Sequence, residues 1–220
     1  MKFVMSYSCG KDSSMALYQA IRAGHEPVAL IVAGNKALER SFFHGVDRKM
    51  LDAYADALGL PLIIAFSNGD DYTERFVEGL EQAKAMGAEA VCYGDLYLPD
   101  SKAWNEAAAE AAGLIPMEPL WDTAPAQNVR DIIQAGFRCV IKIVNHEKLP
   151  ESLLGRVLDE ETVQIMANKG IDICGENGEY HTLVMDGPVF RYPLPVVLGD
   201  ITSAGDYSYI DIRLADAGPD

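Results

Sequence analysis

The sequence is short of basic residues, and this shortage limits what the protein can bind. Eighteen lysines and arginines stand against thirty-three aspartates and glutamates, which gives a formal net charge of −15. A surface of that sign repels phosphate backbones and anionic lipid headgroups, so we expect neither nucleic acid nor a membrane surface as a partner. A local basic pocket for a small anion is still compatible with this charge.

Long apolar runs and paired cysteines are also missing. No window approaches 18 uninterrupted apolar residues, so we expect no transmembrane helix. The opening MKFVMSYSCG reaches a glycine turn too soon for a secretory leader. Cysteines are widely spaced, with no C-x-x-C pair, which disfavours zinc and thioredoxin-like sites and favours reduced thiols. These features predict a cytoplasmic protein.

Strand-like and helix-like segments alternate through the first 120 residues. Helical patterns, several of them followed by glycine, separate the apolar runs. We expect strands at 2–7, 26–34, 61–66 and 88–95, helices at 13–23, 48–58, 72–86 and 102–113, and a short extended piece from 114. This alternation predicts a Rossmann-like α/β domain over residues 1–121, with a parallel sheet covered by helices on both faces.

The pattern changes after Trp121. We expect a helix at 127–135, which leads into a stretch of mixed apolar and basic residues at 137–145, and a helix near 160–168, followed by a tail rich in Gly, Pro and β-forming residues. We therefore predict that residues 122–220 form a smaller C-terminal α+β domain. No internal repeat or low-complexity segment is present.

The turn after the first predicted strand carries the densest chemistry, and its residues are Ser8-Cys9-Gly10-Lys11-Asp12-Ser13-Ser14. Small residues between a strand and a helix N-terminus form a nest of backbone N–H groups that suits an anion. The serine hydroxyls and Lys11 can contact phosphate oxygens, whereas Asp12 suits a bridging Mg²⁺ or a helix cap. The turn fits neither G-x-x-x-x-G-K-[ST] nor G-x-G-x-x-G. A serine-capped helix start that holds no ligand is the alternative.

A second polar cluster lies in the C-terminal part, at Cys174-Gly175-Glu176-Asn177-Gly178-Glu179-Tyr180-His181-Thr182. Strand alternation predicts that Glu179, His181 and Leu183 share one face. A Glu–His pair can orient a nucleophile, act as a general base or bind a metal. An exposed acidic turn leading into a sheet is the alternative.

The first turn resembles the PP-loop, S-G-G-x-D-S, of N-type ATP pyrophosphatases, which split ATP between its α and β phosphates. Cys9 stands where that motif has its second small residue, normally glycine. Because a cysteine in the left-handed region is strained, we predict that Cys9 does not adopt that conformation. We also predict that Cys9 is a tolerated loop residue and not a nucleophile.

Together, the two clusters resemble the signatures of the diphthine–ammonia ligase family. The second cluster, followed by Asp186-Gly187-Pro188, is similar to E-G-G-E-[FY]-x-T…D-G-P, with Asn177 in place of a glycine. Three further matches, to G-D-I, P-L-W and L-G-R, are Gly94-Asp95-Leu96, Pro119-Leu120-Trp121 and Leu154-Gly155-Arg156. The resemblance spans nearly the whole chain.

The resemblance implies a HUP-type, adenine nucleotide alpha hydrolase-like domain that binds ATP, and a C-terminal domain on the substrate side. The implied reaction adenylates a carboxylate, passes the acyl group to ammonia, and releases AMP and pyrophosphate. The substrate is diphthine on elongation factor 2 or a small molecule. The phosphates and Mg²⁺ are expected at Ser8, Cys9, Gly10, Lys11, Asp12, Ser13 and Ser14, with Asp12 as the metal ligand. Adenine is expected near Ile31, Val32, Ala33 and Gly34, and the ribose or α-phosphate near Gly94 and Asp95. The activated carboxylate is expected at Glu176, Glu179, His181 and Thr182, with His181 as the candidate general base.

Two other functions stay open at this stage. One is a PP-loop ATP pyrophosphatase that modifies tRNA, with a cysteine carrying sulfur, which the negative charge disfavours. The other is a non-catalytic ATP-binding or sensing module, which would not need the second polar cluster. The sequence leaves open whether the protein is a homo-oligomer and whether Phe42 and Phe43, beside His44, form a substrate lid or a packing face.

Overall fold

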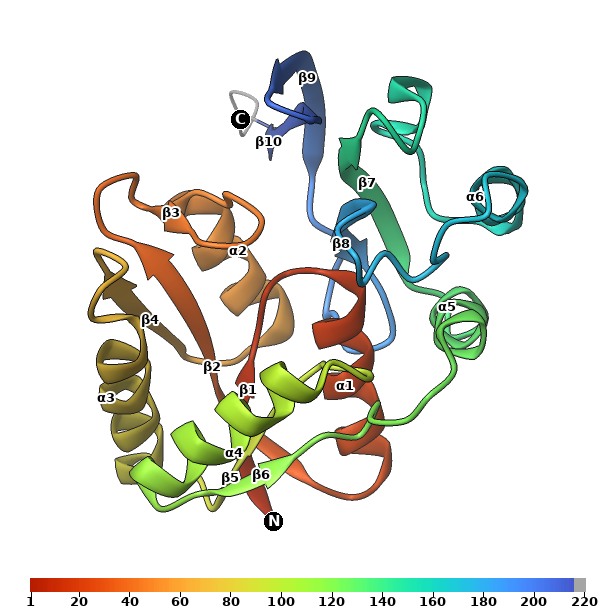
Figure 1. Ribbon diagram of the computed structural model, residues 1–220. Helices are drawn as coiled ribbons and strands as arrows, with labels where there is room; N and C mark the ends of the chain where they lie inside the picture. The colour runs from red at the N-terminus through yellow and green to blue at the C-terminus, as the bar shows by residue number, and fades with distance from the viewer. Residues whose placement is uncertain (216–220) are drawn as a thin grey trace. The chain divides into compact units, whose positions relative to one another are not determined.

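The computed structural model of the protein describes residues 1–215, and the chain divides after Thr123 into two compact units. The first unit alternates strands and helices along the chain (Figure 1). Its elements are β1 (Lys2–Ser6), α1 (Lys11–Arg22), β2 (Glu26–Asn35), β3 (Arg40–Ser41), α2 (Arg48–Leu58), β4 (Leu62–Ser67), α3 (Tyr72–Ala85), β5 (Ala90–Cys92), α4 (Pro99–Ala112) and β6 (Ile115–Met117).

The first unit contains the predicted parallel sheet. Strands β4, β2, β1, β5 and β6 lie side by side in that order and run parallel. The chain builds the sheet outward from β1, first through β2 to β4 and then on the other side through β5 to β6. The order therefore reverses between β1 and β5, and ligands of such sheets bind beyond the carboxyl ends of the strands at this reversal.

Helices cover both faces of this sheet, as predicted. Val4, Ile31 and Val91 pack on one face with α3 and α4, where Leu80 and Ala109 are fully buried. On the opposite face α1 contacts β1, β2 and β5. The alanines of α4 allow its backbone to lie close to α3 and the sheet, which explains why an alanine-rich segment is a core helix here.

Local signals place the helix ends well. Asp47 caps α2 by accepting a hydrogen bond from the Met50 N–H at 2.9 Å, and Gly59 ends the helix at φ 67°. The predicted range 48–58 is the observed one. One strand that was not predicted is β3, a two-residue strand that pairs antiparallel with the end of β2. A strand this short has no periodicity to detect.

The second unit is an α+β structure. Its sheet is antiparallel, in the order β8-β7-β10-β9. The elements are α5 (Pro125–Gln134), β7 (Arg138–Asn145), the 3₁₀ helix η1 (Glu151–Leu153), α6 (Glu160–Asn168), β8 (Tyr180–Asp186), β9 (Val196–Ala204) and β10 (Tyr207–Leu214). The predicted helices are present, and the mixed apolar and basic stretch at 137–145 forms β7.

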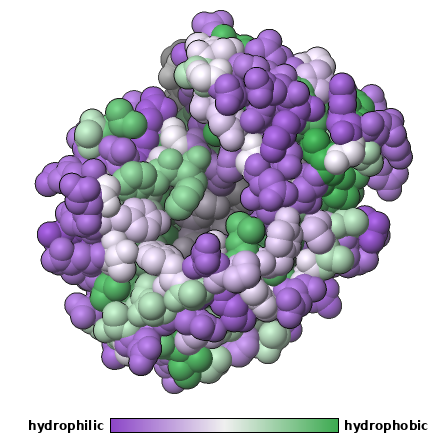
Figure 2. Space-filling view, viewed as in Figure 1, coloured by the Kyte–Doolittle hydropathy of each residue, from purple (hydrophilic) through white to green (hydrophobic). Residues whose placement is uncertain are grey.

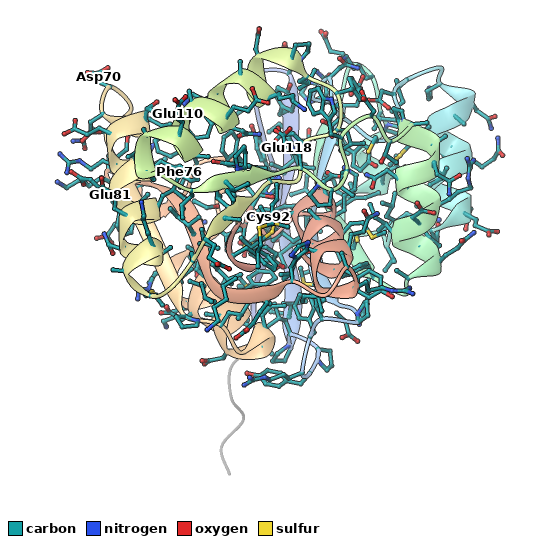
Figure 3. All side chains as sticks on the ribbon, turned by 90° about the horizontal axis from the view of Figure 1, so that it is seen from below. Asp70, Phe76, Glu81, Cys92, Glu110 and Glu118 are labelled. Atoms are coloured by element: carbon teal, nitrogen blue, oxygen red, sulfur yellow. The ribbon has the colours of Figure 1, made fainter. Side chains whose placement is uncertain are left out.

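Hydrophilic residues cover most of the face shown in Figure 2. Among the described residues, no helix combines the length and the apolar character that crossing a membrane requires. Inside the first unit, Cys92 lies within the sheet, whereas Asp70 and Glu81 lie at the surface of the unit (Figure 3).

Candidate active site

The turn between β1 and α1 is held by its own serines. Ser13 Oγ donates to the Gly10 carbonyl at 3.1 Å and accepts from the Ser8 N–H at 3.3 Å. Ser14 is fully buried, and its hydroxyl pairs with the Tyr7 hydroxyl at 3.0 Å. Gly10 occupies the N-cap position of α1 in an extended conformation and, having no side chain, supplies no capping oxygen. This leaves the helix N-terminus as the kind of site that binds anions.

The prediction for the Cys9 backbone is wrong. Cys9 has φ 68°, in the left-handed region, and its side chain is fully buried. The chain has to reverse between β1 and α1 while Gly10 stays extended, so the reversal falls on residue 9. This conformation costs a non-glycine residue about 1–2 kcal/mol, which burial of the thiol helps to offset.

Lys11 and Asp12 form an ion pair at the start of α1. The Lys11 Nζ lies 2.6 Å from Asp12 Oδ2, and the two side chains are 6% and 22% exposed. From the sequence, Lys11 was expected to contact the phosphates and Asp12 to bind a metal ion. The structure brings the two groups together at the helix N-terminus, where they pair with each other.

Gly94 lies directly against the first turn of α1. A Cβ at this position would stand 2.9 Å from the Ser13 backbone nitrogen and 3.0 Å from the Asp12 carbonyl carbon. Only glycine therefore allows this approach without displacing the backbone that begins α1. The structure thus joins the two predicted segments, after β1 and after β5, at the point where the sheet order reverses.

Asp95 is held in a buried polar network. The Asn105 amide, only 3% exposed, donates to Asp95 Oδ2 at 2.9 Å and to Glu118 Oε1 at 3.2 Å. Lys102 pairs with Glu118 at 3.0 Å. Burial raises the pKa of Asp95, and the nearby carboxylates of Glu118 and Asp12 raise it further, against the hydrogen bond from Asn105.

A pocket lies at the carboxyl ends of β1 and β2, where adenine was expected. The predicted residues Ile31, Val32 and Ala33 line it, while Gly34 packs against Ile64 and Phe66 of β4. Lining residues that the sequence analysis did not assign to it are Ser6, Tyr7, Ser41, Phe43, Tyr72 and Phe76. Burial and the Asp95 carboxylate raise the pKa of Tyr72 to about 12, so the tyrosine is a neutral donor at physiological pH.

In the second unit, two turns shape the polar cluster before β8. The Asp172 carboxylate accepts the N–H groups of Cys174 and Glu176 at 2.9 and 3.2 Å. Gly175 and Gly178 adopt φ values of 79° and 74°. Asn177 is not in the left-handed region, so asparagine in place of the family's glycine brings no backbone strain.

The predicted site residues of this cluster have different surroundings. Glu179 is 4% exposed, accepts the Asn177 N–H at 3.0 Å and lies 3.6 Å from Lys148 Nζ. Thr182 is buried at 2%. His181 and Glu176 are half-buried, and His181 pairs with Ile143 across the sheet. Glu179 therefore organises the turn, and of the four predicted residues Glu176 and His181 are the more exposed.

Sequence reasoning missed several residues of these sites. Asn105 and Glu118 are ten and more residues from Asp95, and Lys148 is 31 residues from Glu179. No local pattern marks such partners. Asp172 was detectable in principle, because an aspartate two residues before a cysteine-glycine turn is a common source of side-chain to backbone bonds.

Comparison with known proteins agrees with these two units. Residues 1–116 match the diphthamide synthase N-terminal domain, and residues 124–217 match the diphthamide synthase C-terminal domain. The chain belongs to the diphthamide synthase family. The family recognised from the sequence motifs is therefore confirmed.

Relatives in the diphthamide synthase family are similar along most of this chain. A human diphthine–ammonia ligase is 26% identical, covering 99% of this chain and 87% of the relative. The zebrafish diphthine–ammonia ligase is 27% identical, covering 87% and 84%. A solved structure, described as a predicted subunit of tRNA methyltransferase from Methanocaldococcus jannaschii, matches at a TM-score of 0.45 and 14% identity, covering 88% of this chain and all of that one.

Proposed function

We propose that the protein is an ATP-dependent ligase that adenylates a carboxylate and transfers the acyl group to ammonia. One observation carries the proposal. The Ser8–Ser14 turn and Gly94-Asp95 meet at the carboxyl ends of β1 and β5, where the sheet order reverses and where such sheets bind ligands. The diphthine–ammonia ligase relatives supply the class of reaction.

The first unit is assigned to ATP. Adenine would enter the pocket lined by Ile31, Val32 and Ala33, and the polyphosphate would lie on the turn at the start of α1. Lys11 and the positive end of the helix would stabilise the charge that develops on the departing pyrophosphate. Mg²⁺ fits as a companion of ATP, because one carboxylate, Asp12, together with phosphate oxygens is a common magnesium ligand set. It would neutralise phosphate charge there.

Two bond exchanges complete the reaction. A carboxylate oxygen attacks the α-phosphorus, the bond between that phosphorus and the α–β bridging oxygen breaks, and pyrophosphate leaves. Ammonia then attacks the acyl carbon, the bond to AMP breaks, and a base removes the proton that the new amide nitrogen sheds. Half-buried His181 is the candidate base, because histidine as a residue type can accept and release a proton near neutral pH. We assign Glu179 the role of stabilising the turn that precedes β8.

Diphthine is the first substrate to test, since the names of the relatives contain it. The family resemblance implies that it is carried on elongation factor 2. A small carboxylate is the second substrate to test. A sulfur-carrying tRNA enzyme is a weaker candidate, because all four cysteines are buried and burial raises the pKa of Cys92 to about 12.

The proposal is tested by ATP turnover with ammonium and each carboxylate, with AMP and ADP measured separately. We expect AMP to form, and we expect Asp12→Ala to lower the rate at least 100-fold. Asp52→Ala is the matched control, because Asp52 is an exposed carboxylate on α2 that pairs with Arg48. ADP as the product would overturn the pyrophosphatase assignment, and ATP binding without any AMP would favour a sensing module.

A further inference from the structure

The loop between β3 and α2 reaches the phosphate turn through one histidine. His44 is 8% exposed although its neighbour Phe43 is 63% exposed. Its Nδ1 lies 2.5 Å from the backbone carbonyl oxygen of Ser8. A carbonyl only accepts hydrogen bonds, so Nδ1 carries the proton and donates. No step of the proposed reaction uses this side chain.

The His44 imidazole also packs against Gly10, two residues after Ser8 in the turn. A Cβ on Gly10 would stand 2.7 Å from His44 Cε1 and 3.5 Å from Nδ1. The imidazole therefore occupies the space beside Gly10 and contacts the turn at two backbone positions, Ser8 and Gly10. This explains why the N-cap position of α1 is glycine although its φ is negative.

The hydrogen bond from His44 to the Ser8 carbonyl affects the backbone conformation of Cys9, the strained residue of the turn. Because the peptide group is planar, the φ angle of Cys9 sets the direction of the Ser8 carbonyl. A positive φ turns that carbonyl far from where an ordinary negative φ would point it. A donor fixed at the Ser8 oxygen thus favours the left-handed form of Cys9, which has φ 68°. In a trans peptide the Cys9 N–H then points to the side of the turn opposite His44.

We propose that His44 is a positioning residue of the phosphate-binding turn, which it holds in its left-handed form through the Ser8 carbonyl. His44 acts through the backbone and not on the reacting atoms. The same loop carries Phe43, which lines the pocket at the ends of β1 and β2, so one short segment serves both parts of the nucleotide site. The inference rests on the proposed function to the extent that the turn binds the phosphates of ATP.

Paired variants separate hydrogen bonding from packing. In His44→Asn the amide nitrogen can occupy the position of Nδ1, whereas His44→Leu fills a similar volume without a donor. We expect His44→Asn to bind ATP within about 3-fold of wild type and His44→Leu to bind at least 10-fold more weakly, because the Ser8 carbonyl loses its donor. Arg40→Ala is the control, since Arg40 holds the same loop through the Gly45 carbonyl and does not contact Ser8. It should bind ATP nearly as wild type does.

A further variant, His44→Gln, keeps the test possible if His44→Leu does not fold. If His44→Leu fails to fold, His44→Gln replaces it, because its amide nitrogen matches Nε2 and not Nδ1. Binding by His44→Leu or His44→Gln equal to that of wild type would overturn the inference, as would His44→Asn binding as poorly as either. Wild-type ATP binding without AMP formation would instead contradict the proposed function and leave the positioning role standing.

Discussion

Replacing Gly94 by alanine tests the contact that joins the two strand ends at the candidate site. The added Cβ would stand 2.9 Å from the Ser13 nitrogen, whereas ordinary Cβ contacts begin near 3.4 Å. Both partners are backbone, so no side chain can rotate away. The first turn of α1 has to move by about 0.5 Å, and overpacking of this kind costs about 1–3 kcal/mol.

The functional effect follows from where this movement occurs. Ser13 belongs to the turn assigned to the ATP phosphates, and sites of this kind tolerate displacements of only about 0.5 Å. We expect Gly94→Ala to weaken ATP binding about 10-fold, to lower kcat/KM by about 10- to 100-fold, and to lower the Tm by about 2–10 °C. Calorimetric titration with ATP, steady-state AMP production and thermal unfolding measure the three effects.

Gly199→Ala is the matched control for this experiment. A Cβ there would stand 2.8 Å from Asp211 Oδ2 and 3.0 Å from Asp211 Cβ. Both residues belong to the second unit, so the added crowding falls outside the turn that begins α1. The ATP affinity of Gly199→Ala should stay within about 2-fold of wild type. Unchanged stability and affinity in Gly94→Ala would refute the reasoning about the backbone contact. A lower Tm with unchanged ATP affinity would show that the contact stabilises the fold without shaping the phosphate site.

Three further variants test other parts of the account. Cys9→Gly should keep activity and change the free energy of unfolding by less than about 1 kcal/mol. Relief of the backbone strain at φ 68° offsets the lost burial of the thiol and the greater backbone entropy that glycine loses on folding. A complete loss of activity would make Cys9 a functional residue. Asp95 has a raised pKa in the folded state, so its contribution to stability is present at low pH and is lost as pH rises above the ordinary value. Asp95→Asn should therefore raise the Tm at pH 7 by a few degrees, flatten its pH dependence and weaken ATP turnover, and a lower Tm would contradict this. Lys148→Met removes the cation 3.6 Å from the buried Glu179 carboxylate and the donor to the Asn177 carbonyl. Because the Lys148 side chain is 40% exposed, thermal unfolding should show a loss of only about 1–3 kcal/mol, and AMP production should fall while ATP affinity is kept. Unchanged AMP production would show that the Glu179 turn does not support the chemistry.

The parts of the fold set by local signals could be predicted from the sequence. Strand–helix alternation predicted the parallel sheet, and the glycine after Leu58 predicted where α2 ends. The family was also recognisable, because its motifs depend on glycines that the structure shows to be required. Gly94 meets the backbone of α1, and Gly175 and Gly178 need positive φ values.

The parts set by distant contacts could not be predicted. His44 contacts Ser8 across 36 residues from a loop with no periodic pattern, and Asn105 connects carboxylates from two different strand ends. The φ of Cys9 was misjudged because intrinsic preference was weighed without these contacts. The Ser8 carbonyl bond and the buried thiol favour a conformation that cysteine alone disfavours.

The fate of the carboxylate oxygen tests the central claim most directly. The protein would be incubated with ATP, ammonium and a carboxylate substrate labelled with ¹⁸O, and the AMP would be analysed by mass spectrometry. Adenylation followed by amide formation predicts AMP that carries one ¹⁸O atom from the carboxylate. Unlabelled AMP, or ADP in place of AMP, would contradict an acyl-adenylate route.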